Sequence, residues 1–366
     1  MRQLSGTDSL FLRLERGNQY MHVAGLGIYD PSTAPAGRVR FKDVLRFFET
    51  RLDSLPLFRR RLVTVPLGLD RPYWIEDPDI DIEFHVRHIA LPHPGDWRQL
   101  CIQVARIHSR PLDRSKPLWE AYVIEGLDNI RGLPAGSFAL YLKIHHCAVD
   151  GEAGTDLIRA IHSTLAEDFS EPAARLRRYQ ERMPQEVPTV ARLVTALRKP
   201  PATRFADKVS AHRVVEGVGL PLARVKTIRA SIPAATINDL FMTTVGSALR
   251  RYLAARGELP EATLTRMVPM SFRGPDKTAD VGNQIGMAVM PRHTELHDPI
   301  DRLQEIRRGA AKAKAFNAVV GRDLAARSFE VLPEPAFFRG MPAYKLRGTR
   351  ARGGGDAPAQ GRRRAP

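Results

Sequence analysis

Apolar side chains recur along the chain at two spacings, and these divide it into predicted helices and strands. Apolar residues at near-helical spacing predict helices, and short runs rich in branched and aromatic residues predict strands. In the first half we expect helices at 4–15, 41–52 and 100–108, and strands at 22–29, 73–75, 82–89, 118–125 and 138–144. In the second half we expect strands at 224–232, 264–270 and 285–290, and helices at 236–253 and 299–315.

This alternation of helices and strands is typical of a mixed α/β fold. The chain of 366 residues is longer than one core usually grows, at roughly 150 residues per domain. Charges and prolines replace the periodicity between the halves, so we place a crossover linker at 171–215. This predicts a first half at 1–170 and a second half at 216–340. Residues 341–366 combine glycine, proline and arginine without an apolar pattern, and are predicted to be a disordered basic tail.

Charge and cysteine content narrow the function classes. Lysine and arginine number 56 against 40 acidic residues, a net charge of +16 that favours polyanions, phosphorylated ligands or an anionic membrane face. Nucleic-acid binding is disfavoured, because no aromatic-interleaved basic patch accompanies this charge. Only two cysteines occur, which indicates a reducing, cytoplasmic compartment. No apolar run approaches the ~20 residues of a spanning helix, so we expect any membrane contact to be peripheral.

The clearest predicted strand ends in the sequence HHCAVDG at residues 145–151. A histidine titrates near neutral pH, so one that faces a cleft can accept a proton from a hydroxyl and return it to a leaving thiolate. Adjacent residues at a strand end point to opposite sides, so His146 can face a cleft while His145 packs inside. Asp150 can then anchor the corner, and Gly151 permits a close turn where the next helix begins.

This segment has three other interpretations. The two histidines could be partly buried, satisfied side chains. A zinc site is disfavoured, because neither an HExxH helix nor a CxxC pair accompanies them. A Cys147 nucleophile is also disfavoured, because neighbours on a strand diverge and a small buried cysteine is the simpler interpretation.

HHCAVDG matches the HHxxxDG signature of the coenzyme A-dependent acyltransferase superfamily. Further blocks, in the same order as in the family, make the chain resemble the bacterial wax ester synthase/acyl-CoA:diacylglycerol acyltransferases. These blocks are LSGTDSLFLRLE with MHV at 21–23, PLDRSKPLWE at 111–120, TINDL at 236–240, VPMSFR at 268–273 and GNQIG at 282–286.

The resemblance implies a fold and a set of site residues. The fold has two chloramphenicol-acetyltransferase-like halves, each a mixed sheet flanked by helices, with a tunnel between them. His146 is then the general base, and His145, Asp150 and Gly151 belong to the same corner. Asp150 shapes this corner by pairing with an arginine. The second-half blocks supply candidate substrate-binding residues at Asn238, Asp239, Ser271, Arg273 and Asn283. Helix capping, turn formation or a surface ion pair is the structural alternative for each of these five.

The implied reaction is acyl transfer from acyl-CoA, as a co-substrate, to diacylglycerol or a long-chain alcohol, with neither a metal nor a cofactor. Attachment to the inner face of the plasma membrane or to lipid droplets is expected to be peripheral. After about Phe338 the family pattern stops, so we expect an incomplete second half and poor solubility. Two alternatives stay open: a non-catalytic acyl-CoA or lipid binder, and a condensation-type enzyme that uses carrier-protein thioesters.

Overall fold

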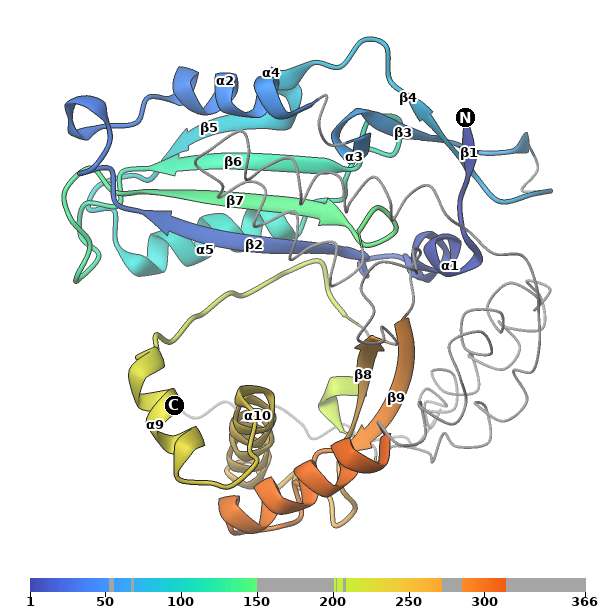
Figure 1. The fold of residues 1–366 in the computed structure, drawn as a ribbon, viewed down its shortest axis with the longest axis vertical. Helices are drawn as coiled ribbons and strands as arrows, with labels where there is room; N and C mark the ends of the chain where they lie inside the picture. The colour runs from blue at the N-terminus through green and yellow to red at the C-terminus, as the bar shows by residue number, and fades with distance from the viewer. Residues whose placement is uncertain are drawn as a thin grey trace, which may run out of the picture.

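The computed structural model describes residues 1–52, 56–66, 69–149, 201, 203–206, 209–271 and 285–313. Its first part is built on a four-stranded sheet in the order β2-β7-β6-β5 (Figure 1). These strands span His22–Tyr29 (β2), Val86–Ala90 (β5), Trp119–Glu125 (β6) and Phe138–His145 (β7). Strand β7 pairs antiparallel with β2 and β6, and β6 pairs parallel with β5. The β2–β7 register sets His22 opposite His145.

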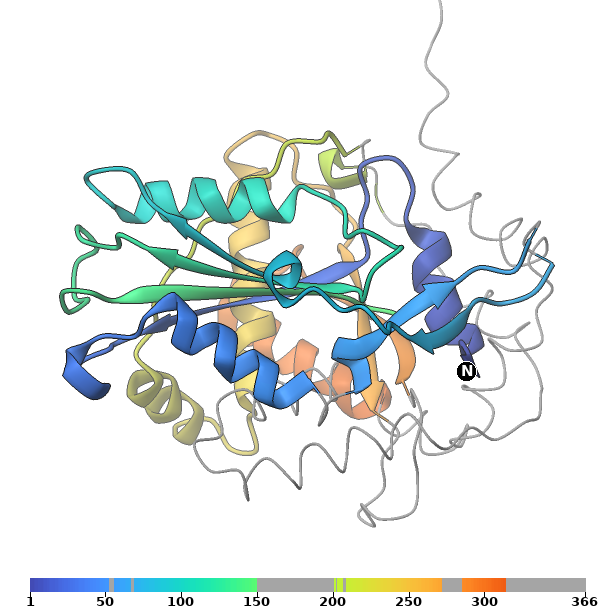
Figure 2. The ribbon, with the colours of Figure 1, turned by 90° about the horizontal axis from the view of Figure 1, so that it is seen from above.

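Helices cover both faces of this sheet (Figure 2). The helices on one face are α2 (Phe41–Leu52) and α4 (Ile82–His85), and the opposite face carries α5 (Trp97–His108). Alternate residues of β7 therefore enter different cores: Leu142 and Ile144 pack in the cluster with α2, and Tyr141 packs in the cluster with α5. The same alternation places Lys143 and His145 on the α5 side of the sheet.

Trp119, at the start of β6, lies at the centre of the α2-side core and is fully buried. Its ring stacks on Phe48 and on His85, with ring centroids 5.7 Å and 4.5 Å apart. Its indole nitrogen donates to the Phe58 carbonyl at 3.1 Å. Aromatic burial with a satisfied N–H fixes the start of β6, where Trp119 pairs in register with Ile144 of β7, just before the histidine corner.

A second, three-stranded sheet lies beside the first, in the order β1-β4-β3. The elements of this region are β1 (Arg2–Gln3), α1 (Gly6–Leu14), α3 (Pro56–Arg59), β3 (Arg60–Val63) and β4 (Tyr73–Glu76). The short helix η1 (Pro35–Gly37) instead lies in the loop between β2 and α2. Helix α1 begins where the Ser5 hydroxyl accepts a hydrogen bond from the Asp8 amide at 3.0 Å. Leu12 of this helix packs with Leu118 and Cys147, so α1 lies against the corner that follows β7.

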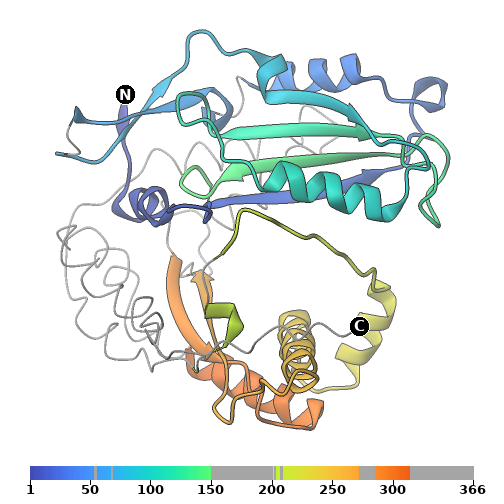
Figure 3. The ribbon, with the colours of Figure 1, turned by 180° about the vertical axis from the view of Figure 1, so that it is seen from behind.

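The second part of the described chain groups its helices with a two-stranded sheet (Figure 3). Its elements are η3 (Arg204–Ala206), α9 (Leu222–Ala230), α10 (Ile237–Ala254), β8 (Thr265–Ser271), β9 (Ile285–Pro291) and a helix at 299–313. A Cβ at Gly246 would lie 3.1 Å from the Cδ atom of Arg302, so this glycine lets the last helix approach α10 closely. Arg302 is almost fully buried and donates to Ser247 Oγ at 2.5 Å.

Most predicted elements are confirmed, and β2 and α2 have the expected bounds. Two predictions are wrong. The strand expected at 82–89 begins only at Val86, because the Asp81 carboxylate accepts hydrogen bonds from the Glu83 and Phe84 amides and starts a helical turn. The strand expected at 224–232 is instead helix α9, which has no buried residue. Its leucine, alanine and basic residues favour a helix where burial in a sheet does not select a strand.

Mixed α/β sheets flanked by helices confirm the predicted fold class. The predicted tail at 341–366 lies outside the described residues, as does most of the predicted crossover at 171–215.

Candidate functional site

The backbone of the histidine corner is held on both sides. The His145 amide donates to the Leu118 carbonyl at 3.0 Å, and the His146 amide donates to the Met21 carbonyl at 2.8 Å. The Ala148 amide returns to the His145 carbonyl at 3.0 Å and closes a turn after β7. The segments at Leu118 and Met21, together with the turn itself, therefore fix the backbone position of His146.

The His146 ring stacks on Phe11 of α1, with centroids 4.1 Å apart and ring planes inclined by 12°. The residue is half-buried, whereas His145 is 1% exposed. This difference in burial agrees with the expectation that adjacent residues at a strand end point to opposite sides. A stacked ring loses rotational freedom, so Phe11 fixes the plane in which the His146 nitrogens lie.

His145 is fixed in one tautomer by its surroundings. Its Nδ1 accepts a hydrogen bond from the Cys147 amide at 3.1 Å. The proton of the neutral ring is therefore on Nε2, which lies 3.2 Å from Glu15 Oε1. His145 is thus a buried support for the corner, at ion-pair distance from the Glu15 carboxylate.

Glu15, at the C-terminal end of α1, holds three groups at once. Its Oε1 also accepts from the Met21 amide at 2.7 Å, and its Oε2 pairs with Arg114 Nη2 at 2.6 Å. Burial by itself would raise the pKa of Glu15, but the hydrogen bonds from His145, Met21 and Arg114 outweigh it and lower the pKa to about 2. Glu15 is therefore a permanent anion that orders the loop and the buried histidine.

Cys147 does not have the surroundings of a nucleophile. Its side chain is 3% exposed among apolar residues. Burial and the nearby Asp8 carboxylate raise the pKa of this thiol well above its ordinary value. Since only the thiolate is a strong nucleophile, the geometry favours a structural cysteine.

A second polar group lies on the α5 side of the sheet, next to His145 in register. His22 Nε2 donates to the His108 carbonyl at 2.9 Å, and His108 Nδ1 lies 2.6 Å from the Tyr141 hydroxyl. Burial lowers the pKa of His22 to about 4. The ring is therefore neutral at physiological pH.

Lys143 is fully buried beside this group. Its Nζ lies 2.9 Å from Glu120 Oε2 and donates to the Arg110 carbonyl at 3.2 Å. The Tyr122 hydroxyl also donates to Glu120 Oε2, at 3.1 Å. Burial lowers the pKa of Lys143, and the neighbouring Glu120 carboxylate opposes that effect. This ion pair ties β6 and β7 to the end of α5.

Among the second-half candidates, Asp239 has a defined structural contact. Its Oδ2 accepts from the Thr236 amide at 2.9 Å and from the Thr236 hydroxyl at 2.7 Å, and the Asp239 amide returns a bond to that hydroxyl at 3.1 Å. This capping box starts α10, in agreement with the helix-capping alternative. Asn238 is exposed in the same first turn, and Ser271 ends β8.

The remaining sequence-predicted site residues lie outside the described residues: Asp150, Gly151, Arg273 and Asn283. The structure therefore brings together His145 and His146 of the predicted set. It adds Phe11, Glu15, Met21 and Arg114, which the sequence analysis did not single out. A usable signal existed, because Glu15 and Arg114 both lie within blocks that resemble the family.

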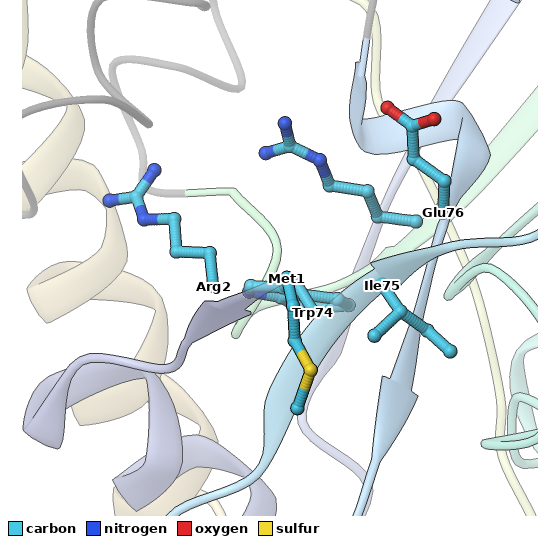
Figure 4. Close-up of a pocket in the computed structure, with 6 residues that line it drawn as sticks. Met1, Arg2, Trp74, Ile75 and Glu76 are labelled. Carbon is cyan, nitrogen blue, oxygen red and sulfur yellow. The ribbon is translucent and has the colours of Figure 1, made fainter.

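A separate pocket of about 370 Å³ lies against the three-stranded sheet (Figure 4). It is lined by Met1, Arg2, Arg60, Trp74, Ile75 and Glu76. Of the predicted site residues that the structure describes, none lines this pocket.

Within the described ranges, the structure has no helix with both the length and the apolar character needed to cross a bilayer.

Comparison with known proteins gives a consistent picture. Residues 4–186 match the family described as the wax ester synthase/diacylglycerol acyltransferase catalytic domain. A putative diacylglycerol O-acyltransferase from Mycobacterium tuberculosis is 30% identical, over 91% of this chain and 76% of the relative. The O-acyltransferase WSD of Acinetobacter baylyi is 34% identical, over 86% of this chain and 72% of the relative.

Solved structures agree with these matches. The wax ester synthase/diacylglycerol acyltransferase from Marinobacter aquaeolei VT8 superimposes with a TM-score of 0.61 and 26% identity, over 94% of this chain and 76% of that one. The first condensation domain of the calcium-dependent antibiotic synthetase gives a TM-score of 0.55 at 16% identity, over 86% of this chain and 75% of that one. The second likeness concerns the fold alone.

Proposed function

The chain belongs to the wax ester synthase/diacylglycerol acyltransferase family, and we propose that it transfers a fatty acyl group from acyl-CoA to the hydroxyl of diacylglycerol or a long-chain alcohol. The observation that carries this proposal is the geometry of His146. Its ring is half-buried and stacked on Phe11, and its backbone is held by Met21. A histidine with a fixed ring plane and a titrating nitrogen suits general-base chemistry.

In the proposed reaction, His146 removes the proton from the acceptor hydroxyl as the oxygen attacks the thioester carbonyl. The C–S bond of the tetrahedral intermediate then breaks, and the imidazolium returns its proton to the leaving coenzyme A thiolate. The proton taken from the alcohol is thus delivered to the thiol, so no external acid or base is consumed. Acyl-CoA enters as a co-substrate, and the proposal includes neither a metal nor a resident cofactor.

His145 and Glu15 have supporting roles in this proposal. The Glu15 carboxylate lies 3.2 Å from Nε2 of His145 and accepts a hydrogen bond from the amide of Met21. Both contacts fix the backbone that carries His146, so its imidazole nitrogen keeps one position relative to the acceptor hydroxyl. We keep Asp150 and Gly151 as corner residues in the proposal, and Asn238, Ser271, Arg273 and Asn283 as candidate substrate contacts.

Peripheral attachment to a membrane or to lipid droplets belongs to the same proposal. Diacylglycerol and long-chain alcohols partition into lipid, so an enzyme that uses them must reach a lipid surface. The net charge of +16 favours an anionic one. We propose the inner face of the plasma membrane or the droplet surface, and co-flotation with anionic against neutral vesicles tests the preference.

The function is tested with labelled palmitoyl-CoA and both acceptors, diolein and hexadecanol, with the lipid products resolved. Wild type should form labelled ester and His146→Ala should lose at least 100-fold in rate, while His297→Ala, an exposed histidine in the second half, should match wild type. Wild type without ester product overturns the enzyme proposal and favours the acyl-CoA binder. A parallel reaction uses palmitoyl-acyl-carrier protein as the acyl donor in place of palmitoyl-CoA. Ester formed with this donor alone favours the condensation-type alternative.

A further inference from the structure

The connecting segment at 209–221 follows η3 and leads directly into α9, both elements of the second part, and between them it contacts the first part of the described chain. It runs beside β2, below the four-stranded sheet (Figure 1). Most of it is exposed, and the Val214 side chain is 92% exposed. A segment with so little burial keeps its place through a small number of specific contacts. Two anchors supply them.

The first anchor is Arg213. Its guanidinium donates to the Asn18 carbonyl, to the Ser210 carbonyl at 2.6 Å and to the His212 carbonyl at 3.0 Å. The Asn18 side-chain amide donates in return to the Val209 carbonyl at 3.4 Å. A planar guanidinium that binds several carbonyls fixes both the segment and the residue it reaches.

Asn18 belongs to a tight turn that leads into Met21. Arg16 and Gln19 exchange both backbone hydrogen bonds, at 3.2 Å and 3.0 Å, and Gly17 between them adopts a φ of 58°. Glycine adopts this left-handed conformation readily, so the turn carries no backbone strain. Two residues after Gln19, the Met21 carbonyl accepts the His146 amide at 2.8 Å.

We infer that Arg213 is a positioning residue that couples the connecting segment to His146 through the turn at 16–19 and Met21. The inference rests on the proposed function. It assigns to the second part of the chain a direct hold on the backbone of the general base. Movement of α9 is transmitted along 209–221 to Asn18, and from there to the residue that holds His146.

The second anchor provides an internal comparison. The Trp97 indole nitrogen donates to Glu216 Oε1 at 2.6 Å, and a Cβ at Gly217 would lie 3.1 Å from the Trp97 ring. Trp97 begins α5, whereas His108, which ends it, contacts His22 beside the histidine corner. A helix of 12 residues rises about 18 Å. Glu216 thus holds the same segment far from His146.

The experiment uses the full chain with the variants Arg213→Ala, Arg213→Lys and Glu216→Ala, together with Arg224→Ala on exposed α9 as a charge-matched control. Arg213→Ala should lower kcat about 10- to 100-fold with less than a threefold change in KM for palmitoyl-CoA. Arg213→Lys should recover part of the rate, because an ammonium cannot reproduce the planar fork. Glu216→Ala and Arg224→Ala should stay within about threefold of wild type.

Hydrogen–deuterium exchange separates this inference from the proposed function. In Arg213→Ala, the amides of Met21 and His146 should exchange at least fivefold faster than in wild type, with no such change in Glu216→Ala. Unchanged exchange at these two amides, or equal changes in both variants, overturns the positioning role. Wild type that makes no ester defeats the proposed function, and the exchange comparison then decides the coupling alone.

Discussion

Nε2 of the buried His145 lies 3.2 Å from Oε1 of Glu15, the same oxygen that accepts the Met21 amide at 2.7 Å. One carboxylate oxygen thus contacts both residues that support His146. These are its chain neighbour His145 and Met21, whose carbonyl accepts the His146 amide. Because the pKa of Glu15 is lowered to about 2, the carboxylate stays ionised across the physiological range. The pair makes the end of α1 part of the candidate site.

Replacing this carboxylate tests its role. Glu15→Gln keeps the shape but removes the charge, so the hydrogen bonds from His145 and Arg114 lose their charge-assisted part. A loss of about 1.5–3 kcal/mol corresponds to a roughly 10- to 150-fold lower kcat. Glu49→Gln, at an exposed position of α2, is the matched control. Equal kcat in both variants would contradict the role given to Glu15.

The buried Cys147 thiol gives a second prediction. A cysteine with a raised pKa in an apolar cluster contributes packing, so Cys147→Ala should keep ester formation within about threefold of wild type. The cavity left behind should lower the free energy of unfolding by about 1 kcal/mol. Steady-state rates and urea unfolding measure the two effects. Loss of all ester formation at unchanged stability would revive the nucleophile interpretation.

The sequence predicted most of the first sheet, because its strands carry dense apolar runs between clear turns. It could not predict α9, since Val225, Thr227 and Ile228 have strand-like side chains, and among the described residues none pairs with them as a strand. The turn at Ile82 was missed for a related reason, because one local cap from Asp81 outweighs strand propensity. Propensity is a weak prior wherever tertiary context decides.

The candidate site was predicted in part. Sequence spacing identified His145 and His146, and their adjacent positions on a strand end correctly implied different surroundings. The Glu15–Arg114 pair joins positions 99 residues apart, and no local pattern encodes such a contact. Asp239 shows the reverse case, because its TxxD spacing with Thr236 is a local capping signal that the structure uses.

His22 predicts a dependence of stability on pH. Its pKa is lowered from 6.5 to about 4 by burial, so the unfolded chain binds a proton in that interval that the folded chain does not. The free energy of unfolding should therefore fall as the pH falls from 6.5 towards 4, by about 1.4 kcal/mol per pH unit from this group.

The variant His22→Gln keeps a donor towards the His108 carbonyl and removes the titration. Urea unfolding of both proteins between pH 7 and pH 5 should show a shallower pH dependence in the variant. His85 and His108 also have lowered pKa values and stay in both proteins, so the difference reports the titration of His22 together with its coupling to His108. Parallel pH profiles would refute the assignment.

The buried Lys143–Glu120 pair predicts an asymmetric response to mutation. Glu120→Leu leaves an uncompensated ammonium in the core and should lower the free energy of unfolding by about 3–5 kcal/mol. Replacing both residues by leucine should cost less than that single change, because no charge remains buried. Chemical unfolding of the single and double variants measures this. A double variant at least as unstable as Glu120→Leu would show that the pair stabilises through more than mutual compensation.

The capping box at the start of α10 allows the two interpretations of Asp239 to be separated. If its carboxylate serves the helix, Asp239→Ala and Thr236→Ala should each lower the free energy of unfolding by about 1 kcal/mol. The double variant should lose less than the sum, because each residue satisfies the other. The KM for acyl-CoA and for diolein should stay within about twofold of wild type in all three proteins. Arg251→Ala, at an exposed position of the same helix, serves as the control for general effects on the helix. A KM raised tenfold or more in Asp239→Ala, with an unchanged KM in Thr236→Ala, would instead place this carboxylate at the substrate. If Asp239 only capped the helix, the two variants should behave alike, because each removes the same reciprocal pair of hydrogen bonds.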